Sequence, residues 1–227
     1  MASRSDVATD RISWTGGAAP PDTATGMALT CWAKLSVDRN DFSTFFRLHA
    51  ASGGTTRLTF ATGSSGETPG LFTPGNTSGV IAPSALVVDG WRPMGVSCTG
   101  TTGTIYIASA DLGTVQSASG TVSGGATATA FTFFGRSSSD ATEWFNGCLA
   151  YARLWGATMT QDEMIAEWAS GTPVKATSLW GAWMVPGQSD LTDVSGNARH
   201  LTAGSTALST EQGPPIDVRR GAFMAFL

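Results

Sequence analysis

The chain has 227 residues and a net charge of -4, and its charged fraction of 13% is well below the roughly 25% of an average soluble protein. The 13 Lys and Arg residues are spread along the chain, whereas nucleic-acid backbones require clustered positive charge, so we expect no nucleic-acid partner. No apolar run approaches the ~18 residues of a membrane helix, and residues 1–10 lack the apolar core of a signal peptide. We therefore expect no membrane span and no Sec-type export.

The hydrophobic pattern favours an all-β fold. Gly numbers 28, and small residues in this abundance are typical of short strands joined by turns. Residues 63–79 are interpreted as a long loop. The run 117–129, which is rich in Ser, Thr, Gly and Ala, is interpreted as an exposed meander or loop. A turn is expected at residues 52–54. Strands are expected at residues 10–14, 27–37, 42–49, 55–61, 91–98, 103–109, 131–135, 144–155 and 179–185.

Residues 144–168 predict a long strand that runs directly into one short helix. Thr160 can cap the helix, and Glu163 can complete a capping box three residues later. Asp162, Glu163 and Glu167 are interpreted as charges of the first turn and of the solvated helix face. One strand face is expected to carry Phe145, Leu149, Tyr151, Arg153 and Trp155, and the other Cys148, Ala150, Ala152 and Leu154.

This strand and helix resemble the last strand and helical turn of laminin-G-like, concanavalin A-like jelly-roll domains, with their pattern F-x-G-x-I-D-D-V-R-I-Y-x-R-x-L-S-x-x-E-I. The acidic residue that follows the Leu149 position in that pattern is replaced by Ala150 in this chain. Residues 27–37 and 91–109 are similar to the strand F-T-I-S-A-W-V-K and the hairpin W-H-H-V-A-V-T…L-Y-V-N-G of these domains. The resemblance implies an antiparallel β-sandwich of the jelly-roll type with one short helix near residues 160–170. Matching positions are Phe145, Gly147, Leu149, Arg153, Leu154, Trp155, Met159, Thr160, Glu163 and Met164.

Residues 179–201 resemble the apolar strand and D-x-S-G-N segment that opens many of these domains. Here the segment follows the helix, so we expect a permuted sandwich, an arrangement that resembles tailed-phage structural proteins. We assign residues 1–26 to an N-terminal strand and loop, 27–203 to the sandwich and 204–227 to a C-terminal tail.

The sequence shows no catalytic constellation. Glycosidases need two carboxylates beside the scissile bond, and the strand motif E-x-D-x-E of the related glucanases is absent. No Cys or His spacing fits a transition-metal site. Cys31, Cys98 and Cys148 each lie in an apolar run and are expected to be buried free thiols.

Two groups of residues could bind a ligand. Trp32 and Trp180 could stack on a sugar ring, although burial in the core or in a subunit interface is the alternative. Asp190, Asp193 and Asn197 could bind Ca²⁺ through oxygen atoms, although the favoured alternative is that Asp193 and Asn197 form Asx turns around Ser195 and Gly196. No other cofactor is expected.

The leading functional hypothesis is a non-catalytic module on a virion surface, such as a bacteriophage capsid decoration protein. The alternative is a carbohydrate-binding module for attachment to a host or to mucus, and glycoside hydrolysis is third. Expected partners are further copies of the chain, or a capsid or tail protein, with a glycan as the alternative. The apolar residues near the C-terminus would then dock on a partner, or else pack on their own sandwich; they are Phe223, Met224, Phe226 and Leu227.

Overall fold

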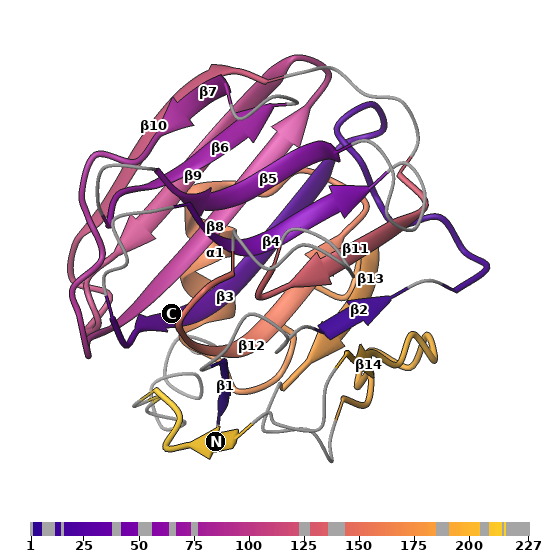
Figure 1. Ribbon diagram of the computed structural model, residues 1–227. Coiled ribbons are helices and arrows are strands. Elements are labelled where there is room, and N and C mark those ends of the chain that lie inside the picture. Colours follow the sequence, from indigo (N-terminus) through magenta and orange to yellow (C-terminus); the bar gives the residue numbers. More distant parts are fainter. Residues whose placement is uncertain are drawn as a thin grey trace, which may run out of the picture.

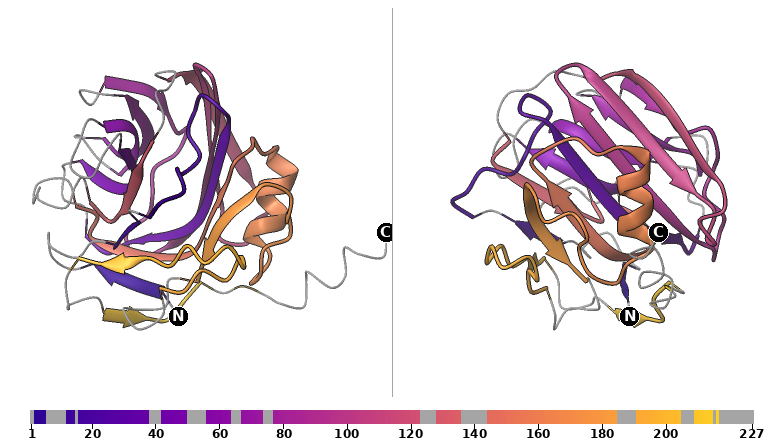
Figure 2. Two further views of the ribbon diagram at one scale, coloured as in Figure 1. Left: turned by 90° about the vertical axis from the view of Figure 1, so that its right-hand side faces the viewer. Right: turned by 180° about the vertical axis from the view of Figure 1, so that it is seen from behind.

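The computed structural model describes residues 2–5, 12–14, 16–37, 42–49, 56–63, 67–73, 77–122, 128–135, 144–184, 191–204, 209–214 and 216. These residues form two antiparallel sheets packed face to face, with one helix outside (Figures 1 and 2). The predicted all-β jelly-roll sandwich with a single short helix is confirmed. No helix in the described ranges is long and apolar enough to cross a membrane.

Sheet A has eight strands among the described residues and carries the helix on its outer face. Its main path runs β10–β9–β8–β3–β12–β1–β15, and β13 also pairs with β12. The bounds are β1 (Ala2–Ser5), β3 (Met27–Leu35), β8 (Trp91–Thr99), β9 (Thr102–Ala108), β10 (Val115–Thr121), β12 (Gly147–Trp155), β13 (Leu179–Trp183) and β15 (Ser209–Glu211).

Sheet B has seven strands among the described residues, in the order β14–β2–β11–β4–β5–β6–β7. Its aromatic side chains fill the space between the sheets, where Phe45, Phe60 and Phe131 are fully buried. The bounds are β2 (Ile12–Trp14), β4 (Ser43–His49), β5 (Thr56–Thr62), β6 (Pro69–Thr73), β7 (Thr77–Ile81), β11 (Ala130–Phe133) and β14 (Thr202–Ala203).

Residues 63–79, interpreted as a long loop, include β6 and the start of β7, so that interpretation is wrong. Residues 117–121 belong to the largely exposed strand β10, in agreement with the meander alternative. The glycines in these strands are required by close packing rather than by turns. A Cβ on Gly79 would lie 2.4 Å from the Thr121 carbonyl oxygen, and one on Gly120 would lie 2.7 Å from the Gly79 carbonyl oxygen. The edges of the two sheets therefore meet along this line with no side chain between them.

Strand β12 contains a bulge that changes which side chains face the core. Its register with β3 shifts between Ala150 and Arg153, and Tyr151 adopts a left-handed φ of 51°. Before the bulge, the free edge of β12 pairs with β1, and after it the same edge pairs with β13. The predicted simple alternation is therefore wrong. The core side carries Leu149, Ala152 and Leu154, and the helix side carries Cys148, Ala150, Arg153 and Trp155.

Helix α1 (Gln161–Trp168) begins with the predicted capping box. The Thr160 hydroxyl accepts from the Glu163 amide at 3.3 Å, and the Glu163 carboxylate accepts from the Thr160 amide at 2.8 Å. Met164 and Trp168 are buried against sheet A. Gly95 of β8 makes room for them, because a Cβ there would lie 2.7 Å from the Met164 sulfur.

The C-terminal half closes the sandwich, as the permuted arrangement predicts. Strand β13 pairs with β12, and Trp183 packs between the sheets against Phe131 with ring centroids 5.5 Å apart. Glu211 of β15 contacts sheet A through its side chain. Its carboxylate forms an ion pair with Lys34 and accepts a hydrogen bond from the Cys148 thiol at 3.0 Å. The predicted free, buried cysteines are confirmed. The predicted turn at 52–54 lies outside the described residues.

Candidate functional site

The structure gives Trp32 a packing role. Its ring is 2% exposed, and its indole nitrogen donates to the Trp168 carbonyl oxygen at 3.1 Å. Both tryptophans lie between helix α1 and sheet A. This position leaves no room for a sugar on the Trp32 ring, and it matches the alternative of core burial.

Trp180 is also packed on both sides. Its ring meets Trp14 edge to face at 4.8 Å, and the Arg199 guanidinium carbon lies 4.3 Å from its ring centre. Its indole nitrogen donates to the Ala19 carbonyl oxygen at 3.1 Å. The Arg199 cation covers the ring by a cation–π contact, so no free face remains for sugar stacking.

Asp193 organises the loop that follows β13 rather than an open ion site. Its carboxylate accepts from the amides of Ala182, Ser195 and Arg199 and from the Ser195 hydroxyl, at 2.8–2.9 Å. Burial alone would raise the pKa of Asp193, but these hydrogen bonds outweigh it and hold the pKa below its ordinary value. The side-chain amide of Asn197 donates to the Leu179 and Trp180 carbonyl oxygens.

This geometry agrees with the Asx-turn alternative, because the Asp193 carboxylate already accepts four hydrogen bonds. Asp190, the third candidate ligand, lies outside the described residues. Within those residues, no group of three or more His, Cys, Asp or Glu side chains could hold a metal ion. Calcium binding stays a prediction. The proposed docking residues Phe223, Met224, Phe226 and Leu227 also lie outside the described ranges.

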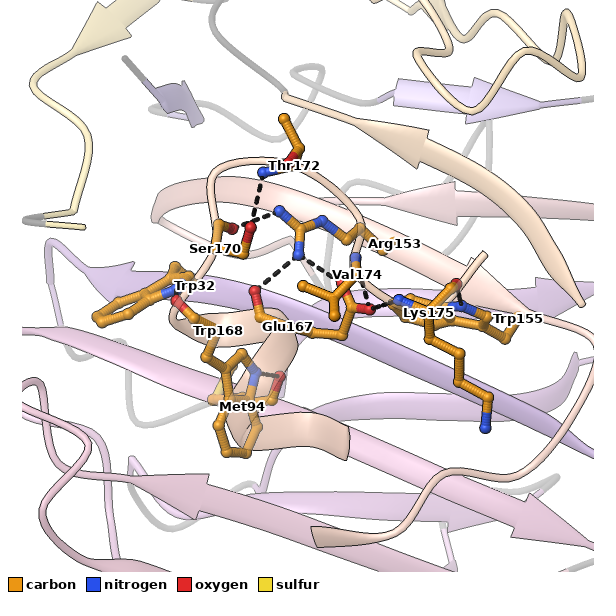
Figure 3. A network of polar contacts seen from close by, with 10 residues as sticks. All are labelled: Trp32, Met94, Arg153, Trp155, Glu167, Trp168, Ser170, Thr172, Val174 and Lys175. Carbon is orange, nitrogen blue, oxygen red and sulfur yellow. Dashed lines mark hydrogen bonds and ion pairs between the residues drawn. The ribbon is translucent and has the colours of Figure 1, made fainter. Parts of the chain in front are cut away.

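A buried ion pair ties helix α1 to sheet A (Figure 3). The Arg153 guanidinium, on the helix side of β12, contacts the Glu167 carboxylate at 2.6 Å, and both side chains are at most 2% exposed. The guanidinium also donates to the Glu167 and Ser170 carbonyl oxygens. The other Glu167 oxygen accepts from the amides of Val174 and Lys175. We call these five residues the Arg153 clamp.

The Arg153 clamp corrects the interpretation of Glu167 as a solvated helix charge. Burial lowers the pKa of Arg153, and the Glu167 carboxylate opposes that effect. Buried charges persist when they are paired and fully hydrogen-bonded, and the clamp meets both conditions. Its groups bond to one another and to the backbone, so we assign it a structural role in holding the helix and residues 170–175.

A different set of polar side chains lies on the outer face of sheet B. Thr132 of β11, Arg47 of β4 and Thr59 of β5 are direct register partners across the sheet, so they share a face. His49 lies two residues beyond Arg47 on the same face, and Thr44 lies before it. All five side chains are at most 6% exposed. We call Thr44, Arg47, His49, Thr59 and Thr132 the outer-face cluster.

The outer-face cluster contains buried polar atoms with unused hydrogen-bonding capacity. Within the described part of the chain, His49 Nδ1, Thr59 Oγ1 and Thr44 Oγ1 have no hydrogen-bond partner. Each unpaired buried polar group costs about 1–3 kcal/mol, and native proteins contain few of them. Phe72 of β6 is the register partner of Thr59 and therefore extends the same face with an aromatic ring. Phe42 meets that ring edge to face at 5.2 Å.

No local pattern marks the outer-face cluster in the sequence. Polar residues at Arg47 and His49 alternate with apolar ones, but alternation of this kind indicates only a half-buried strand. The bulge between Thr44 and Phe46 breaks the alternation further. Only the pairing of β4 with β5 and β11 brings the cluster together. The seven strands of sheet B carry no Asp or Glu, so they do not supply the two carboxylates of a glycosidase.

Two packed antiparallel sheets with a single external helix define a protein of the jelly-roll class. Residues 8–164 match the Concanavalin A-like lectin/glucanases superfamily. The match covers more than half of the chain, which therefore belongs to this superfamily. No curated protein sequence matches the chain.

Solved structures from diverse sources share the fold. A candidate carbohydrate-binding protein from Bacteroides ovatus is 12% identical with a TM-score of 0.65, over 96% of this chain and 61% of that one. A heptameric SAP-like pentraxin from Limulus polyphemus is 10% identical with a TM-score of 0.53, over 69% and 74%. The enzymatically active domain of tailspike protein 2 from bacteriophage CBA120 is 14% identical with a TM-score of 0.53, over 74% and 28%.

At these identities the likeness shows the fold alone. The chain spans about six tenths of the length of the Bacteroides protein and about a quarter of the tailspike domain. Lectins and glycosidases both occur in this superfamily, and fold alone does not separate them.

Proposed function

We propose that this chain is a non-catalytic carbohydrate-binding module whose glycan site is the outer-face cluster. One observation carries the proposal: His49 Nδ1 and Thr59 Oγ1 are buried polar atoms on the same sheet face, and neither has a hydrogen-bond partner among the described residues. Sugar hydroxyls both donate and accept hydrogen bonds, so one saccharide could satisfy both atoms. The lectins of the superfamily and the Bacteroides protein of similar fold support this choice of ligand.

The size of the cluster fits a sugar ring. His49 lies diagonally across from Thr59 on the neighbouring strand, with a register shift between Leu48 and His49. Regular diagonal neighbours lie within roughly 7–8 Å of each other, a span that one hexose can bridge. Phe72 lies beside Thr59 and offers apolar area next to the polar atoms, which is the usual composition of a small-molecule site.

A glycan array, read after long incubation, tests this proposal. We expect binding by the wild-type chain and at least tenfold weaker binding by Thr59→Val, which removes one hydroxyl and keeps the shape. The matched control is Thr104→Val, on the outer face of sheet A, whose hydroxyl pairs with Ser119 at 2.8 Å. A silent array, or equal binding by wild type and Thr59→Val, would overturn the proposal.

We also propose a particle-associated role, as a virion surface module that contacts further copies of itself or a capsid or tail protein. The permuted closure by β13 supports it, together with the fold shared with the phage tailspike. Deleting residues 221–227 should reduce oligomer mass or particle incorporation without lowering the melting temperature. Unchanged assembly with a less stable chain would show that these residues pack on their own sandwich.

Turnover in a β-glucan screen would instead favour the glycosidase alternative.

A further inference from the structure

The hydrogen bonds around His49 determine which of its ring nitrogens carries the proton. The Thr132 hydroxyl donates to the Gly135 carbonyl oxygen at 2.8 Å. That hydroxyl has a single proton, so it can only accept from His49 Nε2, which lies 3.1 Å away. The neutral His49 ring therefore carries its proton on Nε2, and Nδ1 presents a lone pair.

The surroundings keep the ring neutral at pH 7. Burial lowers the pKa of His49 to about 4, and the positive charge of Arg47 contributes in the same direction. Arg47 is the charged neighbour on β4 itself. The strands packed beside β4 present Thr132 and Ala130 from β11 and Thr59 from β5 to this face. Strands β5 and β11 contain no Asp or Glu that could stabilise the imidazolium.

We propose that His49 Nδ1 is a specificity-determining acceptor, which selects ligands that donate a hydroxyl or amide proton at this point. Thr132 is the positioning residue that holds the required tautomer. This inference rests on the proposed glycan site and deepens it. Carboxylate, sulfate and phosphate groups cannot donate to a lone pair, so the cluster selects a neutral, hydroxyl-bearing saccharide at this position.

The tautomer can be measured without any ligand. The chain has only two histidines, His49 and His200, so a ¹⁵N-labelled sample and a His200→Gln control assign the His49 signals in long-range ¹H–¹⁵N spectra. At pH 7 we expect a protonated Nε2 and an unprotonated Nδ1. Thr132→Val should give a mixture of tautomers. A protonated Nδ1 or an imidazolium in the wild type would overturn the inference directly.

Binding is tested with a fixed probe set of methyl glycosides of mannose, galactose and glucose, their monodeoxy analogues, and glucuronic acid. One deoxy analogue of the bound sugar should bind at least tenfold more weakly to the wild type. His49→Phe should lose at least tenfold in affinity for the parent sugar, while His49→Gln, whose amide oxygen can accept, should retain part of it. Thr132→Val should be weaker by several-fold.

The pH profile separates this role from simple packing. Protonation removes the Nδ1 lone pair, so wild-type affinity should fall as pH falls through about 4, while His49→Gln should show no such step. Equal profiles, or tight binding of glucuronic acid through its carboxylate at this site, would contradict the assignment. If no probe binds while the tautomer is as described, the ligand role fails together with the glycan site; a wrong tautomer with glycan binding intact overturns this inference alone.

Discussion

At the scale of single residues, the structure distinguishes charges that hold the fold from charges in water. Glu163 and Glu167 lie one helical turn apart on α1 and both pair with a cation. The Glu167 side chain is fully buried, whereas that of Glu163 is 37% exposed. Exposed pairs contribute about 0–1 kcal/mol, but removing one member of a buried pair leaves an uncompensated charge.

We therefore predict unequal effects at these two positions. Glu167→Leu should lower the free energy of unfolding by about 3–5 kcal/mol, because Arg153 stays buried without its partner. Glu163→Gln should cost under about 1 kcal/mol, since glutamine can also complete the capping box. Urea denaturation followed by circular dichroism measures both. Similar small losses for the two variants would show that the Arg153 clamp does not stabilise the helix.

At the scale of elements, helix α1 depends on a complementary surface on sheet A. Its eight residues are too few for an isolated helix, which is marginal below ~12–15 residues in water. The capping box starts the helix, and burial of Met164 and Trp168 over Gly95 holds it in place. The Trp168 indole nitrogen adds a hydrogen bond to the Met94 carbonyl oxygen at 3.1 Å.

Gly95→Ala should loosen the helix. The new Cβ would lie 2.7 Å from the Met164 sulfur and 3.2 Å from both the Leu29 carbonyl oxygen and a ring carbon of Trp168. Such overpacking costs about 1–3 kcal/mol. Gly171→Ala is the control, because nothing lies within 4 Å of a Cβ there, and surface changes of this kind stay within about 0.5 kcal/mol. Thermal melting measures both, and equal melting temperatures would contradict the packing argument.

At the scale of the whole molecule, segments far apart in sequence complete the same sandwich. Strand β1 and strand β13 share one edge of β12, and Figure 1 shows β1 and β14, from the two ends of the described chain, at the same end of the molecule. Trp180 and Trp183 bring the C-terminal half into the core between the sheets. The sandwich is therefore complete only when residues after the helix are present.

A chain that ends at Gly171 should not fold. It lacks β13 and both of these tryptophans, and losing a single buried tryptophan side chain costs about 3–5 kcal/mol from a total stability of about 5–15 kcal/mol. A chain that ends at Gly204 is the control, because it keeps β13 and both tryptophans and loses only the short edge strand β15 from the described sheets. Solubility and the cooperativity of thermal unfolding measure the difference. Cooperative unfolding of the shorter chain would refute the role of β13 in closure.

Features that depend on neighbours along the chain could be predicted from the sequence. Capping of α1 by Thr160 and Glu163 is local, and the apolar runs at residues 27–37 and 91–98 predicted β3 and β8. The superfamily motif around residues 145–164 was readable for the same reason.

Features that depend on distant segments could not be predicted in this way and became visible in the fold. The bulge at Tyr151 follows from the exchange of β1 for β13 along β12. The burial of Glu167 follows from its contact with Arg153. The glycines of β7 and β10 are required because two sheet edges meet there. The outer-face cluster likewise exists only because three strands pair in one register. Such contacts join residues tens of positions apart, and no local pattern encodes which partner each side chain meets.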